Sequence, residues 1–402
     1  MQRLSGSYSL KSSPILQFDC QSRTQRNIKI EGWEIPDNSC SLIKCDKGIA
    51  VIYVSQPGEI PIYYWVSPKK ICWSEQKFQL PKCSKQIKPG ELIIWEPGFI
   101  TSYFYDSLEI GESRNDYSLL EAFEEYKNLI LQAVKKRLET LPNPQKVAVA
   151  QSGGLDSLLI TWALKQLNVE IYGLTVCTSE KDLDFVAASA YLAESKIPHL
   201  PLVLTQEEIP KLLGEAITYI ENVETSNVRM AMGNILMARK CQELGISGIF
   251  VGHGHDDIHG KGTLVKAALK VAPGETEAKK WANARKNVTL ATGGMLKMFA
   301  STFRSYGINV RMPYYDTHLL KWAFTQPLTI IPIAYDKPFV RALANHILPQ
   351  GIWLSKQHSV GYLKGSGLSL KQQLLKDTQL LTKSHLQKLL TRIKHENSTR
   401  AH

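Results

Sequence analysis

The stretch VAVAQSGGLDSLLI, residues 147–160, constrains the fold of this chain more than any other. Four apolar residues are followed by small flexible residues and then by an apolar helical pattern, which predicts a strand, a tight loop and a helix. The loop SGGLDS, residues 152–157, therefore lies at a helix N-terminus. The N–H groups and the dipole of a helix N-terminus favour an anion, and a phosphate suits such a place.

The residue types of this loop suit a polyphosphate. Gly153 and Gly154 let the backbone approach closely and adopt positive φ, while Ser152 and Ser157 add hydroxyl donors. Asp156 would repel phosphates unless a cation lay between them, so we expect it to hold Mg²⁺. The alternative is a plain turn in which Asp156 and Ser157 cap the helix. The complete loop after a strand favours the nucleotide interpretation.

Composition and charge favour a cytoplasmic protein. The 402 residues suffice for two or three domains, no apolar run approaches the ~20 residues of a membrane span, and the N-terminus lacks a signal-type stretch. Seven cysteines without a Cys-x-x-Cys pair argue against a disulfide framework or a zinc site. Much of the net charge of +11 lies in 261–297 and 371–400 without an interleaved aromatic series, which favours a solvated surface over a nucleic-acid site.

The residue pattern divides the chain into two domains. Residues 1–110 carry short β-type runs between prolines and glycines, which predict a small mainly-β domain, and 111–117 are the predicted linker. In 118–402 helices alternate with apolar strands, which predicts an α/β domain with a doubly wound parallel sheet and ligands at the strand carboxyl ends. The predicted strands are 48–54, 60–66, 91–95, 147–150, 170–176 and 248–251, and the predicted helices include 118–141, 184–195 and 227–244.

A second glycine-rich strand end carries GHGHDDIHG, residues 252–260. Two such loops converge in a parallel sheet, so we expect Asp256 to meet Asp156 across one Mg²⁺ and a pyrophosphate group. The three histidines beside Asp257 also permit a zinc site, which is the weaker alternative because a loop beside phosphates already explains the carboxylates. His253 directly follows the strand and is the candidate acid or base.

Several segments, taken together, resemble a known family. The SGGLDS loop resembles the PP-loop of ATP pyrophosphatases, and later segments resemble the synthetase domain of asparagine synthetases. The resemblance implies a PP-loop, adenine nucleotide alpha hydrolase-like fold. The matching segments are 152–157, 225–240, 252–257, 310–316 and 335–356.

The first domain resembles the second half of the glutaminase domain of that family, through residues 56–64, 71–75 and 87–91. The family uses a cysteine that is exposed once the initial Met is removed, whereas this chain has Gln2 there. The resemblance therefore implies a truncated Ntn glutaminase domain without glutamine hydrolysis, as in β-lactam synthetases and lasso-peptide cyclases.

The activity implied by the resemblance is ATP-dependent amide formation. A substrate carboxylate attacks ATP to give an acyl-adenylate and pyrophosphate, and an amine then displaces AMP. ATP and Mg²⁺ are the implied cofactors, with Asp156 and Asp256 as metal ligands. Lys356 would stabilise the developing charges, and His253, which stands where the family has Glu or Tyr, would act as base. The implied nucleotide contacts are Ser152, Gly153, Gly154, Leu155, Asp156, Ser157, Leu174, Val176 and Gly252.

Four further positions in the second domain depart from the pattern of the family. Met295 and Met298 stand where it has an acidic residue and an Arg, Asn309 where it commonly has Glu, and Leu354 where it has Arg. These differences argue against aspartate as substrate and favour a larger or less polar acyl group in specialised-metabolite or peptide biosynthesis. Two alternatives stay open, a PP-loop enzyme that modifies tRNA and a non-catalytic ATP-binding partner protein.

Overall fold

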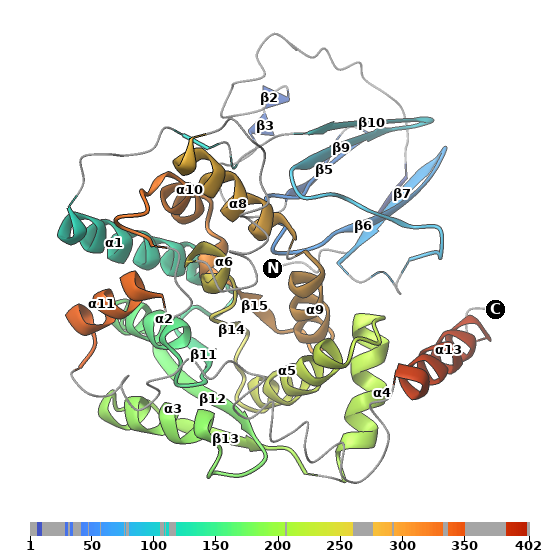
Figure 1. The fold of residues 1–402 in the computed structure, drawn as a ribbon. Coiled ribbons are helices and arrows are strands. Elements are labelled where there is room, and N and C mark those ends of the chain that lie inside the picture. Colours follow the sequence, from blue (N-terminus) through green and yellow to red (C-terminus); the bar gives the residue numbers. More distant parts are fainter. Residues whose placement is uncertain are drawn as a thin grey trace. The chain divides into compact units, whose positions relative to one another are not determined.

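The structure of this chain is a computed structural model (Figure 1). It describes residues 42–349, strands 6–9, 29–30 and 33–34, and helix 383–399, with the exception of 47, 57, 76, 78–79, 105–107, 109, 112–117, 206, 260–275, 292 and 333–336. Within this described part, we find no helix with the length and hydropathy needed to cross a membrane.

The chain forms two compact units, each of which draws on separate segments. The first consists of Met1–Arg114, Lys266–Ala300 and Tyr315–Gln326, and the second of Asn115–Val265, Ser301–Tyr314 and Pro327–His402. The first unit thus includes two segments of the predicted synthetase domain. The predicted domain boundaries at residues 110 and 118 stay predictions.

The first unit contains two antiparallel sheets, with strand orders β1-β7-β6-β8 and β10-β9-β5-β4. Their strands are β1 (Gly6–Ser9), β4 (Leu42–Asp46), β5 (Ile49–Tyr53), β6 (Tyr63–Ser67), β7 (Lys70–Ser74), β8 (Lys85–Gln86), β9 (Glu91–Glu96) and β10 (Phe99–Phe104), and β2 (Lys29–Ile30) pairs with β3 (Trp33–Glu34). Alternate residues of β5 and β9, such as Ile52 and Trp95, join Ile71 of β7 in one core cluster. The predicted strand 60–66 begins only at Tyr63, because Pro61 cannot donate a ladder hydrogen bond.

Two helices of this unit, α8 (Glu277–Ala291) and α10 (Thr317–Thr325), are joined by a buried arginine. Arg285 of α8 donates to the carbonyl oxygen of Ala323, 2.7 Å away in the last turn of α10. Burial lowers the pKa of Arg285 to about 10, so the guanidinium is charged at neutral pH. A cation at a helix C-terminus is favourable, and here it also satisfies a carbonyl group.

The second unit is built on a five-stranded parallel sheet of order β13-β12-β11-β14-β15. The chain moves outward from β11 to β13 and then continues on the other side of β11, which makes the β11/β14 boundary a topological switch point. The predicted α/β class is confirmed. The strands are β11 (Lys146–Ala150), β12 (Glu170–Cys177), β13 (His199–Val203), β14 (Gly248–Phe250) and β15 (Asn309–Arg311).

The helices of this unit pack on the sheet and on one another (Figure 1). They are α1 (Leu119–Glu139), α2 (Leu155–Gln166), α3 (Leu183–Glu194), α4 (Ile209–Ile220), α5 (Thr225–Glu243), α6 (His255–His259), α11 (Pro338–Ile347) and α13 (Lys383–Thr399), while α9 (Gly293–Arg304) includes residues of both units. Helix α1 begins at a capping box of Ser118 and Glu121. Its buried residues Phe123, Tyr126 and Ile130 recur every three or four positions, so one face of α1 is turned inward.

Candidate functional site

The loop between β11 and α2 has a shape that only glycine permits at its centre. Gly153 has a φ of 66°, in the left-handed region. A Cβ atom added there would lie 2.5 Å from the Cβ atom of Ala187 on α3, so the backbone of the loop lies directly against that helix. Gly154 is the N-cap of α2 and brings no side chain to the first turn.

Three successive N–H groups of this loop point to oxygen atoms of its own side chains. Gly153 N lies 3.2 Å from Gln151 Oε1, and Ser152 N and Gly154 N each lie 3.4 Å from a serine oxygen, on Ser157 and Ser152 respectively. These distances are long for hydrogen bonds. Ser157 is buried and its hydroxyl faces Gln151 Oε1 inside the loop. A phosphate oxygen is a stronger acceptor than these neutral groups, and phosphate binding by this loop stays a prediction.

The two predicted metal ligands converge on a single cation, the ammonium group of Lys337. Lys337 Nζ lies 2.7 Å from Asp156 Oδ1 and 2.9 Å from Asp156 Oδ2, and it forms a second ion pair with Asp256 Oδ1. The side chain of Lys337 is only 8% exposed, whereas those of Asp156 and Asp256 are 29% and 34% exposed. Both carboxylates are thus open to a ligand, and their two negative charges exceed the one positive charge.

The charges of this cluster stabilise one another. Burial alone would raise the pKa of Asp156, but attraction to Lys337 and the hydrogen bond from His255 outweigh it and hold that pKa well below its usual range. Burial alone would lower the pKa of Lys337, but its two carboxylate partners outweigh it and raise that pKa. Asp156 and Lys337 are therefore both charged at neutral pH.

A chain of hydrogen bonds leads from Asp156 into the core. His255 Nδ1 lies 2.6 Å from Asp156 Oδ1, and the Tyr126 hydroxyl lies 2.7 Å from both His255 Nε2 and His259 Nε2. A carboxylate only accepts, so His255 donates through Nδ1. Burial lowers the pKa of His255, which is therefore neutral and accepts from Tyr126 through Nε2. The tyrosine oxygen in turn accepts from His259, so every donor in the chain points toward Asp156.

Two further strand ends close around Asp156. Gly252 follows β14, and a Cβ atom added to it would lie 3.1 Å from Asp156 Cβ, so the two loops are in close contact. Tyr314 follows β15 and donates its hydroxyl to the backbone oxygen of Asp156 at 2.8 Å. The Tyr314 ring also stacks on His255, with centroids 4.0 Å apart. The ends of β11, β14 and β15 thus meet at this aspartate, as expected at a switch point.

His253, the candidate base, is a weak proton acceptor in this structure. Burial lowers its pKa to about 4, because the effect of burial outweighs the nearby carboxylates of Asp256 and Asp156, which raise that pKa. The imidazole is therefore neutral at pH 7, but a general base works best when its pKa lies near the operating pH. The assignment of His253 as base stays a prediction that this pKa does not favour.

The remaining predicted nucleotide contacts lie on α2 and β12. Leu155 is the first residue of α2, beside the loop. The carbonyl oxygen of the buried Leu174 accepts from Gln151 N at 2.8 Å, so that carbonyl is used in holding the loop on β12. Val176 lies two residues further along β12. The contacts of these three residues with a nucleotide stay predictions.

The described residues that depart from the family pattern lie on different elements of the structure. Asn309 on β15 accepts from Arg304 at 2.6 Å and donates to the carbonyl oxygen of Ser247 at 2.9 Å, so its amide has a structural role. Met298 is buried on α9 in the first unit, where Met295 is half-buried. Lys356 and Leu354 lie outside the described residues, and the predicted role of Lys356 stays a prediction.

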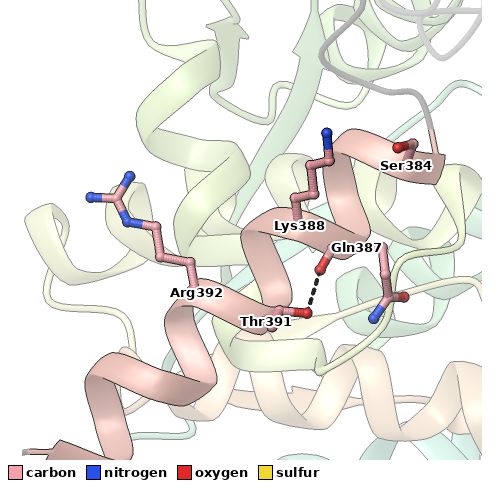
Figure 2. Close-up of a pocket in the computed structure, with 5 residues that line it drawn as sticks. All are labelled: Ser384, Gln387, Lys388, Thr391 and Arg392. Atoms are coloured by element: carbon pink, nitrogen blue, oxygen red, sulfur yellow. Dashed lines mark hydrogen bonds between the residues drawn. The ribbon is translucent and has the colours of Figure 1, made fainter.

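The weaker zinc alternative finds no support in the described part of the chain, where no three His, Cys, Asp or Glu side chains form a metal-binding group. His255 and His259 instead both contact Tyr126. A depression elsewhere on the surface is lined by residues of α13 alone (Figure 2). The lining residues are Ser384, Gln387, Lys388, Thr391 and Arg392. Asp156, Asp256, Lys337 and the residues hydrogen-bonded to them are not among these.

Four residues around Asp156 were not predicted as part of its site from the sequence. Lys337 lies within the segment 335–356 that resembles the family, but nothing in the neighbouring sequence predicts that it lies beside two carboxylates. His255 and His259 are four residues apart, which places them on one face of a helix, and this spacing was a usable signal. For Tyr126 the sequence pattern predicts only a buried position on an amphipathic helix.

The match to a family model supports the resemblance to asparagine synthetases. Residues 125–306 match the family model described as asparagine synthase. An NMN synthetase from Francisella tularensis is 11% identical with a TM-score of 0.25, and the match covers 36% of this chain and 58% of that one, little more than half its length. An NH3-dependent NAD synthetase from Campylobacter jejuni is 14% identical with a TM-score of 0.29, covering 70% of this chain and 96% of that one. By the family match, which includes Asp156, Asp256 and the loop between β11 and α2, residues 125–306 form a domain of the asparagine synthase-like family.

Proposed function

We propose that this protein is an ATP-dependent, AMP-forming ligase that joins a carboxylate to an amine without hydrolysing glutamine. The observation that carries the proposal is the convergence of Asp156 and Asp256 on one cation, at the N-terminus of α2 and beside a loop of inward-pointing N–H groups. Paired carboxylates next to an anion site are what a metal-bound polyphosphate requires. The match to the asparagine synthase family supports the same reaction class.

The residues present fit Mg²⁺. Asp156 and Asp256 already share a cation, both are partly open to solvent, and oxygen ligands of this kind suit Mg²⁺ together with phosphate oxygens. When bound, Mg²⁺ supplies neutralisation of the phosphate charges and orients them. These two aspartates would hold it, in exchange for part of their contact with Lys337.

The chain itself contributes the remaining groups of the proposed reaction. The N–H groups of residues 152–154 would bind oxygens of the pyrophosphate, and the N-terminal dipole of α2 would stabilise the negative charge that develops there. Lys337, released from the aspartates, would add a second positive charge beside the phosphates. Lys356 is proposed to stabilise the transition state of adenylation, and His253 to take the proton from the amine.

The proposed acyl substrate is larger or less polar than aspartate. Met295 and Met298 stand where the family has an acidic residue and an Arg, so the chain lacks those groups for an amino-acid substrate. Both an external amine and an amine of the same molecule are compatible with the proposal. The biological setting that we propose is the synthesis of a specialised metabolite or a modified peptide.

Product analysis tests this proposal. Purified protein is given ATP, Mg²⁺ and pools of carboxylic acids and amines, alongside Asp156→Asn and the control Glu215→Gln, which alters a carboxylate paired with Arg239 instead. We expect AMP and pyrophosphate from the wild type and the control, and neither from Asp156→Asn. ADP and phosphate as products, or ATP binding without turnover, would instead indicate a different reaction or a non-catalytic partner protein.

A further inference from the structure

We propose that Tyr126 and His255 are positioning residues for Asp156, holding its carboxylate so that it can receive a divalent cation. The inference rests on the proposed function, because it assigns these two residues to the metal site proposed there. Neither residue is expected to touch the nucleotide. They act through Asp156 alone.

The chain that links these residues is closed to water. Tyr126 and His255 are 0% exposed and His259 is 2% exposed, so water cannot replace any of the three links between His259 and Asp156. Each link measures 2.6 or 2.7 Å. The links join three separate helices, α1, α6 and the first turn of α2. Asp156 is therefore fixed with respect to two other helices of its unit.

Ring packing prevents the members of the chain from rotating. His255 lies flat on Tyr314, with ring centroids 4.0 Å apart, and His259 stacks on Phe339 at 5.6 Å. Tyr126 meets Phe339 edge-on at 5.4 Å. Packed rings hold one rotamer. The donor on His255 Nδ1 thus stays aimed at Asp156.

The hydrogen bond from His255 to Asp156 matters most when a metal ion replaces the ammonium group of Lys337. Asp156 Oδ1 accepts from both His255 and Lys337, and Oδ2 lies 2.9 Å from Lys337. A metal ion and the ammonium group compete for the same carboxylate, so Lys337 has to give way. The bond from His255 does not depend on Lys337 and holds the carboxylate plane during this exchange. Hydrogen bonds of this kind to a ligand tune metal affinity.

The test measures binding of Mn²⁺ in the presence of ATP by electron paramagnetic resonance, with Mn²⁺ as the probe for the Mg²⁺ site. We expect His255→Leu to weaken Mn²⁺ binding by ~10–100-fold, the usual effect of losing a hydrogen bond to a ligand. His255→Asn, whose amide can donate from nearly the position of Nδ1, should recover most of that loss. Tyr126→Phe should weaken binding by about 3- to 10-fold, because it removes the buried hydroxyl that bonds both His255 and His259.

A double variant separates positioning from general stability. The amide of His255→Asn does not reach Tyr126, so adding Tyr126→Phe to it should cause no further loss of Mn²⁺ affinity. The matched control is Tyr191→Phe, which removes the hydroxyl of another buried tyrosine in the same unit. Thermal unfolding of each variant shows whether it is folded. Equal Mn²⁺ affinity in Tyr126→Phe and Tyr191→Phe, or equal loss from Tyr126→Phe in both backgrounds, would overturn the inference.

Asp156→Asn distinguishes a failure of this inference from a failure of the proposed function. If Asp156→Asn binds Mn²⁺ and ATP as the wild type does, the metal site itself is wrong and both proposals fall. If Asp156→Asn loses Mn²⁺ while His255→Leu keeps it, only the positioning role is wrong. Loss in both, with recovery in His255→Asn, supports the inference.

Discussion

Replacing Lys337 by Met is the substitution that most directly perturbs the charge balance of the candidate site. Methionine keeps an unbranched apolar stem but removes the ammonium group. Asp156 and Asp256 then face each other without the cation that both contact. We expect the variant to be less stable than the wild type when no divalent ion is present.

The size of the loss follows from the burial of the three groups. Removing one partner of a buried ion pair typically costs ~3–5 kcal/mol. The two carboxylates are 29% and 34% exposed, and His255 still donates to Asp156, so both charges keep partial compensation. We therefore expect a loss of about 2–3 kcal/mol in the free energy of unfolding, after discounting for solvent screening. For a unit of this size that corresponds to a fall in Tm of roughly 5–10 °C.

The assay is thermal unfolding followed by circular dichroism, with a chelator and then with excess Mg²⁺. Mg²⁺ should restore part of the Tm of Lys337→Met because it can take the place of the ammonium group. Adding Asp256→Asn to Lys337→Met should also raise the Tm, since it removes one of the two repelling charges. Lys127→Met, which breaks an exposed ion pair with Glu124, is the control and should change stability by less than about 1 kcal/mol. An unchanged Tm in Lys337→Met, or a further fall on adding Asp256→Asn, would refute this reasoning.

Three further predictions concern other parts of the chain. Gly153→Ala should lower the free energy of unfolding by more than the ~1–3 kcal/mol of a strained backbone alone and should abolish ATP binding. Gly245→Ala, at the same φ of 66° but with nothing within 4 Å of the added Cβ atom, should lose only the backbone contribution. Urea unfolding compares the stability of the two variants, and calorimetry compares their ATP binding. Arg285→Met should lower the free energy of unfolding by roughly 1–3 kcal/mol, because the carbonyl group of Ala323 loses its charged donor, and an unchanged urea midpoint would contradict this. The pKa of His253 falls from 6.5 to about 4 on folding. The unfolded chain therefore binds the proton first, and the free energy of unfolding should drop by up to about 3 kcal/mol as the pH falls from 6.5 toward 4. Urea unfolding at several pH values should show a shallower drop in His253→Asn than in the wild type, and an equal drop would contradict this.

The meeting of Asp156 and Asp256 was predictable because it depends on topology alone. Both follow apolar strands of one parallel sheet, and β11 and β14 turn out to be neighbours. Carboxyl ends of adjacent parallel strands lie at the same edge, so the loops after them converge. Gly153 and Gly252 indicated the same two loops, and the structure shows a close backbone approach at each glycine.

Other parts of the fold had no usable local pattern. Strand β15 has only three residues, too few to show a period, and β13 contains Pro201, which disfavours a strand assignment except at an edge. The structure does place β13 at the edge of the sheet. Lys337, the N-cap residue of α11, contacts Asp156 directly, and Tyr126 of α1 is linked to it through His255. Such pairings arise from tertiary packing, which the local sequence does not encode.

The most direct test of the account is a crystal structure of the protein with Mg²⁺ and the α,β-methylene analogue of ATP, which cannot be cleaved between these phosphates. We predict a metal ion held by Asp156 and Asp256, phosphate oxygens on the N–H groups of residues 152–154, and the ammonium group of Lys337 moved from the aspartates to the phosphates. A nucleotide bound elsewhere, or Lys337 still between the two aspartates with no metal beside them, would contradict the account.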